Sequence, residues 1–106
     1  MVRVTAKYNI KLKEYHSCWA QIVSLEEHSY TILTWKGTVS EVAHDDLRLM
    51  SRANQDKAQT LLSQLNQIYD SKSQDPDCVA FLHYLGTKPD PSASAWAIDV
   101  LNFSLR

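Results

Sequence analysis

The side chains that could bind a metal ion or act as a nucleophile in this sequence are its histidines and cysteines. They are His16, His28, His44, His83, Cys18 and Cys78. A structural zinc site needs four ligands at characteristic spacings, and neither His16-x-Cys18 nor His44 has neighbours that would complete one. Cys78 and His83 stand five residues apart in a helical pattern, so their side chains point to different faces and form no nucleophile–base pair. We therefore predict no metal site, no cofactor and no enzymatic activity, with both thiols free as in a reducing compartment.

Two of the three tryptophans occupy related places in the sequence. The segment 18–37, CWAQIVSLEEHSYTILTWKG, consists of two apolar-rich runs joined by a charged elbow. Trp19 begins the first run and Trp35 ends the second. Neighbouring strands joined by a tight turn pair antiparallel, so both rings are expected at the same end of the pair. Two interpretations stay open: an aromatic rim that binds a ligand, or a cross-strand pair packed in a core.

The spacing of apolar residues changes near residue 51, from period two before it to steps of three and four after it. The first strand predicted by this pattern is long or bent. The predicted strands cover residues 2–12, 19–25, 30–35, 38–43 and 47–50. Successive short strands with tight connections curl into a barrel, because curling removes exposed edges. Residues 1–50 are therefore predicted to form a small antiparallel β-barrel.

The second half of the sequence carries signals for three helices. Asn54 is placed to cap the first. Asp75 and Asp90 are each followed by proline, a combination that begins helices because aspartate accepts from free backbone N–H groups where proline needs no partner. Gly86 fits the carboxyl end of the middle helix. The predicted fold class is therefore α+β, with residues 51–106 packed on the barrel as one compact unit.

The segment 15–50, YHSCWAQIVSLEEHSYTILTWKGTVSEVAHDDLRLM, resembles a Tudor or Agenet domain, the small SH3-like barrel found in survival motor neuron protein and fragile X protein. The resemblance covers about a third of the chain, and the helical half has no counterpart in it. The features that carry it are Trp19-Ala20-Gln21-Ile22, the elbow Glu26-Glu27-His28, the strand from Tyr30 to Trp35, the turn at Gly37, and the closing residues Val42, Asp46, Leu47 and Arg48.

Tudor domains of the reader type bind methylated lysine or arginine in a cage of aromatic rings, whose faces attract a cation by about 0.5–2 kcal/mol per contact. The resemblance implies a non-catalytic module that binds a protein segment at such a rim. The peptide-binding residues that it implies are Trp19, Trp35, Tyr15, Tyr8, Asp45 and Asp46. The sequence departs from the reader pattern at Lys36-Gly37-Thr38, where readers carry a further aromatic and an acidic or amide residue. The two aspartates also fit an ordinary turn.

Two alternative functions rest on other residues. The last helix is apolar on more than one side, which suits a structural adaptor or a homodimer. Its candidate partner face is Trp96, Leu101 and Phe103. A nucleic-acid-binding barrel is the other alternative, through a basic face at Arg3, Lys7, Lys11 and Lys13. A net charge of -1 argues against it, because such binding depends on an excess of positive charge.

No apolar stretch approaches the roughly 18–20 residues that a membrane span needs. The first residues alternate basic with apolar side chains and lack the unbroken apolar middle of a signal peptide. The expectation is therefore an intracellular protein with a protein or peptide partner, or a second copy of itself, and no membrane contact.

Overall fold

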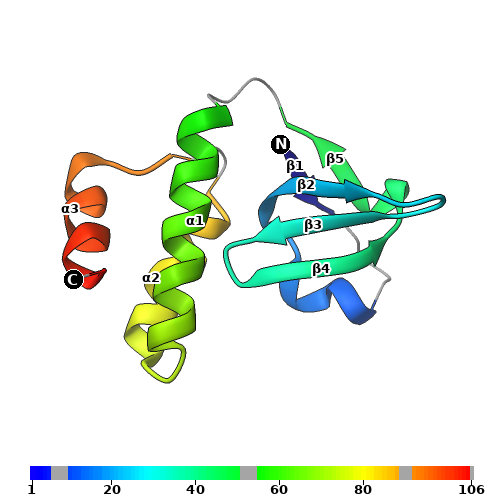
Figure 1. Cartoon of the computed structure of the whole chain (residues 1–106). Coiled ribbons are helices and arrows are strands. Elements are labelled where there is room, and N and C mark those ends of the chain that lie inside the picture. The colour runs from blue at the N-terminus through cyan, green and yellow to red at the C-terminus, as the bar shows by residue number, and fades with distance from the viewer. Residues whose placement is uncertain (6–9, 51–54, 89–91, 106) are drawn as a thin grey trace.

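The computed structural model describes residues 1–5, 10–50, 55–88 and 92–105, which form an antiparallel sheet followed by three α-helices (Figure 1). The strands are β1 (Val2–Val4), β2 (Trp19–Leu25), β3 (Tyr30–Thr34), β4 (Gly37–Val42) and β5 (Leu47–Leu49). The helices are α1 (Gln55–Lys72), α2 (Pro76–Gly86) and α3 (Ala95–Ser104), and two short 3-10 helices are η1 (Ile10–Tyr15) and η2 (His44–Asp46). The predicted α+β class is confirmed.

The sheet has the strand order β4-β3-β2-β1-β5 and is not closed. Within the described residues its outer strands, β4 and β5, do not pair with each other. β2 pairs with a different strand along each half of its length. Trp19 and Ala20 pair with β1, and the segment from Gln21 to Leu25 pairs with β3. The register shifts between Ile22 and Ser24. A shift of this kind bends a strand and increases its twist, which lets β2 pair with β1 at one end and with β3 at the other.

The predicted first strand is too long. β1 ends at Val4, and the 3-10 helix η1 occupies the part of the predicted strand that begins at Ile10. The chain then reverses through Ser17, which has a φ of 68° and whose N–H donates to Val4 O at 2.9 Å. The reason is tertiary, because Leu12 of η1 is fully buried in the hollow of the curled sheet. The alternation of apolar residues alone does not distinguish a buried residue of a short helix from one of a continuing strand.

The buried side chains form two clusters on opposite sides of the sheet. The cluster inside the curl consists of Val2, Val4, Leu12, Ala20, Ile32, Val39 and Val42. The cluster between the sheet and the helices consists of Cys18, Trp19, Trp35, Leu61, Leu62, Leu65, Ile68, Leu82, Leu85, Ala97 and Leu101. Side chains of successive strand residues point to opposite faces of a sheet. Trp19 and Ala20 of β2 therefore belong to different clusters.

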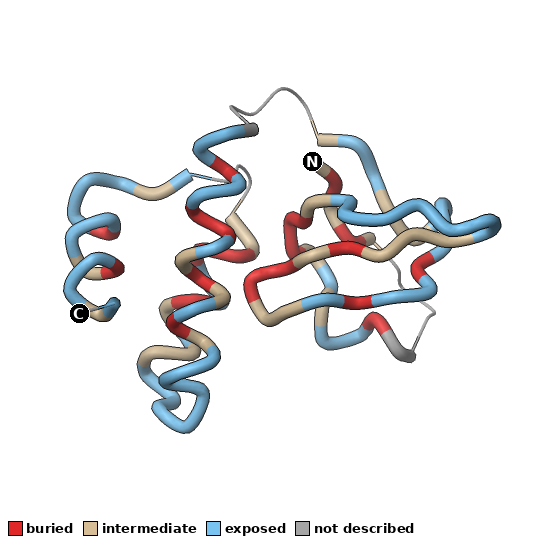
Figure 2. The backbone as a smooth tube through the Cα atoms, in the orientation of Figure 1, coloured by how far each residue is buried: buried red, intermediate tan, exposed pale blue. Residues whose placement is uncertain are grey.

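The helices form two layers beside the sheet, with α1 between the sheet and α3 (Figure 1). Buried residues of α1 recur along its length between exposed ones, as Figure 2 shows. Side-chain hydrogen bonds fasten helices to sheet: Trp19 Nε1 donates to Leu85 O at 2.8 Å, and Asn66 Nδ2 donates to Thr34 O at 2.8 Å.

The start of α2 agrees with the prediction from the sequence, and the start of α3 differs from it. Asp75 caps α2 as predicted, with its Oδ1 accepting from the N–H groups of Asp77 and Cys78. α3 begins only at Ala95, where Ser94 Oγ accepts from Ala97 N at 3.2 Å, so the prediction of a helix start after Asp90 is wrong. Residues 92–94 are not helical. Asn54, Asp90 and Pro91 lie outside the described residues.

Replacing Asp75 by alanine is expected to lower the free energy of unfolding by about 1 kcal/mol, because two N–H groups of α2 lose their acceptor. Urea unfolding followed by circular dichroism measures the change. Asp99→Ala, at an exposed position inside α3, is the control and should stay within about 0.5 kcal/mol of the wild type. Equal losses in the two variants would contradict the cap.

Candidate functional site

The two tryptophans of the expected rim are buried. Trp19 is 0% and Trp35 3% exposed, and both belong to the cluster between sheet and helices. The indole of Trp35 meets Tyr69 of α1 and His83 of α2 edge-on, with ring centroids 5.5 and 5.8 Å apart. Both rings therefore lie in one packed cluster, and the expected open rim is wrong, because contacts from α1 and α2 cover it.

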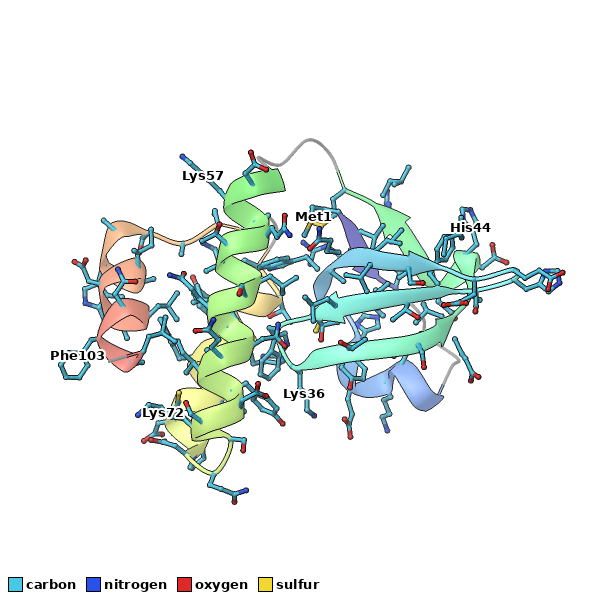
Figure 3. All side chains as sticks on the ribbon, in the orientation of Figure 1. Met1, Lys36, His44, Lys57, Lys72 and Phe103 are labelled. Atoms are coloured by element: carbon cyan, nitrogen blue, oxygen red, sulfur yellow. The ribbon has the colours of Figure 1, made fainter. Side chains whose placement is uncertain are left out.

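The remaining residues of the implied cage do not assemble around these rings. Tyr15 is half-buried at the end of η1, and Lys36 Nζ lies 6.0 Å from its ring centroid. Asp45 and Asp46 belong to η2, which starts at His44. Figure 3 places His44 and Lys36 at opposite ends of the sheet, so the two carboxylates are remote from Trp35. Tyr8 lies outside the described residues.

Both aspartates lie in the short helix η2, and Asp46 stabilises that turn. Asp46 Oδ2 accepts from Ala43 N at 3.3 Å, and Asp46 O accepts from Thr5 N at 2.9 Å. Lys36 Nζ is likewise engaged within the chain, at 3.0 Å from Glu14 Oε2. That hydrogen bond raises the pKa of Lys36, so the group stays cationic beside Tyr15. The cation beside the Tyr15 ring is therefore the protein's own Lys36, which also pairs with Glu14.

Gly86 lies directly against Trp35. A Cβ on Gly86 would stand 2.9 Å from Trp35 Cβ and closer still to the ring atoms Cγ and Cδ1. The sequence places Gly86 at the carboxyl end of α2, which is confirmed. The structural need for glycine is different from a helix cap, however, because the absence of a side chain is what lets the indole approach the helix.

The covered end of the sheet also contains Cys18. Burial raises the pKa of its thiol above the ordinary value of 9.0, and the indole N–H of Trp35 lowers it in part. Within the described residues this N–H makes no hydrogen bond that meets ordinary geometric limits. A buried N–H without an acceptor costs free energy, so Trp35 stabilises the fold through its packing and not through its polarity. The thiol is neutral and shielded, unlike a reactive cysteine.

The two thiols are expected to react at different rates with a reagent such as 5,5′-dithiobis(2-nitrobenzoate). Cys78 is partly exposed and Cys18 fully buried. We expect one equivalent to be released quickly from the native protein and the second only as fast as the protein opens. Cys78→Ser should abolish the fast phase and leave the slow one. A fast phase that survives in Cys78→Ser would contradict the burial of Cys18.

Of the predicted basic face, the structure places the side chains of Arg3 and Lys13. The guanidinium of Arg3 donates to two backbone carbonyls, those of Ser17 and Lys88, each at 2.6 Å. Arg3 thereby joins β1 to the segment after α2 instead of facing a ligand. Lys13 is exposed, whereas Lys7 and the side chain of Lys11 lie outside the described residues. The sequence has no signal for the role of Arg3, because its acceptors are backbone groups.

The predicted partner face of α3 is found in part. Trp96 is 68% and Phe103 75% exposed, whereas Leu101 is 1% exposed and packs in the cluster between the sheet and the helices. Leu101 is therefore not part of the exposed face of α3. The ring of Trp96 rests edge-on against Phe81 of α2, with centroids 6.0 Å apart. Figure 3 shows Phe103 at the outer side of α3, pointing away from α1.

The described residues contain no group of three or more histidine, cysteine, aspartate or glutamate side chains that could hold a metal ion. None of the described helices combines the length and apolarity of a membrane span.

A shallow groove of about 550 Å³ runs between α1 and strands β2 and β3. Its α1 wall bears Asp70 and uncharged side chains, which form no cluster of catalytic type. Comparison with protein-family models, with curated proteins and with solved structures finds no match.

Proposed function

We propose that the protein is a non-catalytic protein-interaction module that binds its partner through the outer side of α3. The observation that carries the proposal is the exposure of Trp96 and Phe103. These residues stand seven apart, so both lie on one stripe of the helix together with Asp99 and Val100. We call the four residues the α3 stripe.

Aromatic rings are the side chains that contribute most at protein interfaces. A buried aromatic ring covers about 150–250 Å². Trp96 and Phe103, about two-thirds or more exposed, therefore leave on the order of 300 Å² of ring surface in water. That area reaches the size of the largest apolar patches on ordinary monomers, which are often functional.

The sheet serves as the scaffold in this proposal, and we propose that it is of the SH3-like, Tudor-like type. The support for this is the pairing of β1 with both β2 and β5, and a separate core inside the curl. The family's reader activity is not part of the proposal, because the two tryptophans that would form the cage are covered by helices.

A matched pair of surface variants tests the proposal. Tagged protein is used as bait in an extract of the cells that contain the untagged chain, and bound proteins, including untagged copies, are identified. The test variant is Trp96→Gln with Phe103→Gln. The control is Leu25→Gln with Leu49→Gln, which changes side chains that are 72% and 84% exposed elsewhere.

The proposal expects the wild type and the control to retain the same partner and the test variant to lose it. All three proteins should have the same melting temperature within a few degrees, since only exposed residues change. Retention of an unchanged set of proteins by the test variant, or the absence of any partner for the wild type, would overturn the proposal.

A further inference from the structure

We infer that Arg3 of β1 is a positioning residue for the α3 stripe: it holds α3 on α1 from the other end of the chain, and without it α3 opens while the rest of the fold stays intact. The inference rests on the proposed function in that it concerns the placement of the same stripe. The placement itself is a property of this chain alone and is measured without a partner.

α3 is the helix with the fewest buried residues. Of its ten residues only Ala97 and Leu101 are buried, whereas five of the described side chains of α1 are buried. A single helix of this length is not stable in water. α3 is therefore helical only while it is docked. With so little buried surface of its own, contacts in the segment that leads into α3 contribute a large share of its docking.

Two hydrogen bonds join that segment to the sheet. The guanidinium of Arg3 donates to Ser17 O and to Lys88 O, each at 2.6 Å. Ser17 lies in the turn before β2, where its φ is 68°, and Lys88 follows the end of α2 at Gly86. The donors of a guanidinium stand in a rigid planar fork. A side chain that binds both carbonyls therefore fixes the position of Lys88 relative to the sheet.

Lys88 extends this constraint toward α3. Its Nζ donates to Ser92 O at 2.9 Å and lies 3.4 Å from Ser92 Oγ. Two residues further along, Ser94 caps α3 by accepting from Ala97 N at 3.2 Å. The contacts of Arg3 with Lys88 and of Lys88 with Ser92 therefore act in series, from the first strand to the start of the last helix.

The course of the chain explains why the position of Lys88 matters. Figure 1 shows α3 on the side of α1 that faces away from the sheet, so the chain must pass α1 to reach it. The six residues between Lys88 and Ala95 allow a span of at most about 25 Å, and a helix with its side chains is about 10–12 Å wide. A fixed Lys88 confines α3 near its place on α1. A released Lys88 lets α3 range more widely, which lowers its effective concentration there.

Hydrogen–deuterium exchange of the whole chain, measured by mass spectrometry of its peptides, reports the opening of each helix. In the wild type the amides of α3 should exchange faster than those of α1. Arg3→Gln should raise the rate in α3 about tenfold, because hydrogen bonds from a charged donor are lost. The rates in α1 and α2 should stay within about twofold of the wild type.

Arg48→Gln is the matched control. Arg48 is exposed and lies directly opposite Arg3 in the register of β1 with β5, so its replacement removes the same charge at the neighbouring position. Exchange in α3 should be the same in this variant as in the wild type. An equal rise in α3 for both variants would mean that net charge, and not the contact with Lys88, sets the rate, and the inference would be wrong.

A double variant tests whether Arg3 acts through Lys88. Lys88→Met removes the ammonium group but keeps the backbone carbonyl that Arg3 binds, and by itself it should speed exchange in α3 about threefold. Because the two contacts act in series, Arg3→Gln with Lys88→Met should exchange α3 no faster than Arg3→Gln alone. Effects that multiply would show two independent contacts and would overturn the inference.

Two further results would also overturn it. One is an equal rise of exchange in all three helices of Arg3→Gln, which would make Arg3 a general stabiliser of the fold. The other is an α3 that exchanges as slowly as α1 in the wild type, which would mean that α3 opens only when the whole protein unfolds.

The bait experiment described above separates this inference from the proposed function. If Arg3→Gln opens α3 selectively but the wild type captures no partner, the positioning role stands and the interaction module fails. If a partner is captured through Trp96 and Phe103, Arg3→Gln should weaken the capture although both rings are still present. A captured partner together with unchanged exchange and unchanged capture in Arg3→Gln would leave the module standing and show the positioning role to be wrong.

Discussion

Replacement of Trp35 by alanine is expected to remove about 3–5 kcal/mol from the free energy of unfolding. The native side chain is 3% exposed and contacts rings from both α1 and α2. Its removal leaves a cavity that the sheet and two helices cannot easily close. Since small domains have only about 5–15 kcal/mol in total, the variant should lose a large fraction of its stability. Urea unfolding monitored by far-ultraviolet circular dichroism measures the loss.

Trp96→Ala is the matched control for this change, because it removes the same side chain where it is 68% exposed. We expect it to cost about 1 kcal/mol or less, mostly through the lost contact with Phe81. A Trp35→Ala protein with wild-type stability would mean that the ring is free at the surface, and an aromatic binding rim would again have to be considered.

The local elements of the fold could be predicted well from the sequence. β2, β3 and β4 agree with the predicted ranges within one residue, because each run is rich in strand-forming residues and is bounded by polar or glycine turns. The start of α2 follows from the chemistry of Asp75 and the proline after it. These signals act over a few residues and do not depend on the rest of the chain.

The features that could not be predicted are set by contacts between distant residues. Leu12 continues the period-two apolar pattern of the predicted strand, but in the fold it is buried inside the curl of the sheet from a 3-10 helix. The exposure of Trp19 likewise depends on α2, whose Leu85 O accepts its indole N–H across 66 residues of sequence. Periodicity reports that a residue is apolar on one face, but it does not report what covers that face.

The candidate site was misread for the same reason. Two aromatic rings at one end of a strand pair fit a binding cage and a packed core equally well. The distinguishing signal was in the other half of the chain, where the apolar residues of α1 and α2 require a surface to cover. The exposed rings of α3 were predicted, with Leu101 assigned to the wrong side. The last helix has apolar residues around much of its circumference, so the sequence did not specify which side meets α1.

The contact between Gly86 and Trp35 predicts an inversion of the usual order of helix formers. Inside a helix alanine is more stable than glycine by about 0.5–1 kcal/mol. Gly86→Ala should instead lower the free energy of unfolding by about 1–3 kcal/mol, because its Cβ would overlap the indole in a closely packed cluster. Thermal unfolding should show a fall in melting temperature of about 4–8 °C per kcal/mol. Gly86→Val, with two further methyl groups, should lose more.

The exposed Ala80 on the same helix provides the control for Gly86→Ala. Ala80→Gly should destabilise by up to about 1 kcal/mol, as intrinsic propensity requires. Alanine is thus expected to be the better residue at position 80 and the worse one at position 86, within a single helix. Propensity has the same sign at both positions, so only the overlap with Trp35 explains a difference between them. A Gly86→Ala protein that is more stable than the wild type would mean that the indole does not lie against α2, and the account of why the rim is closed would be wrong.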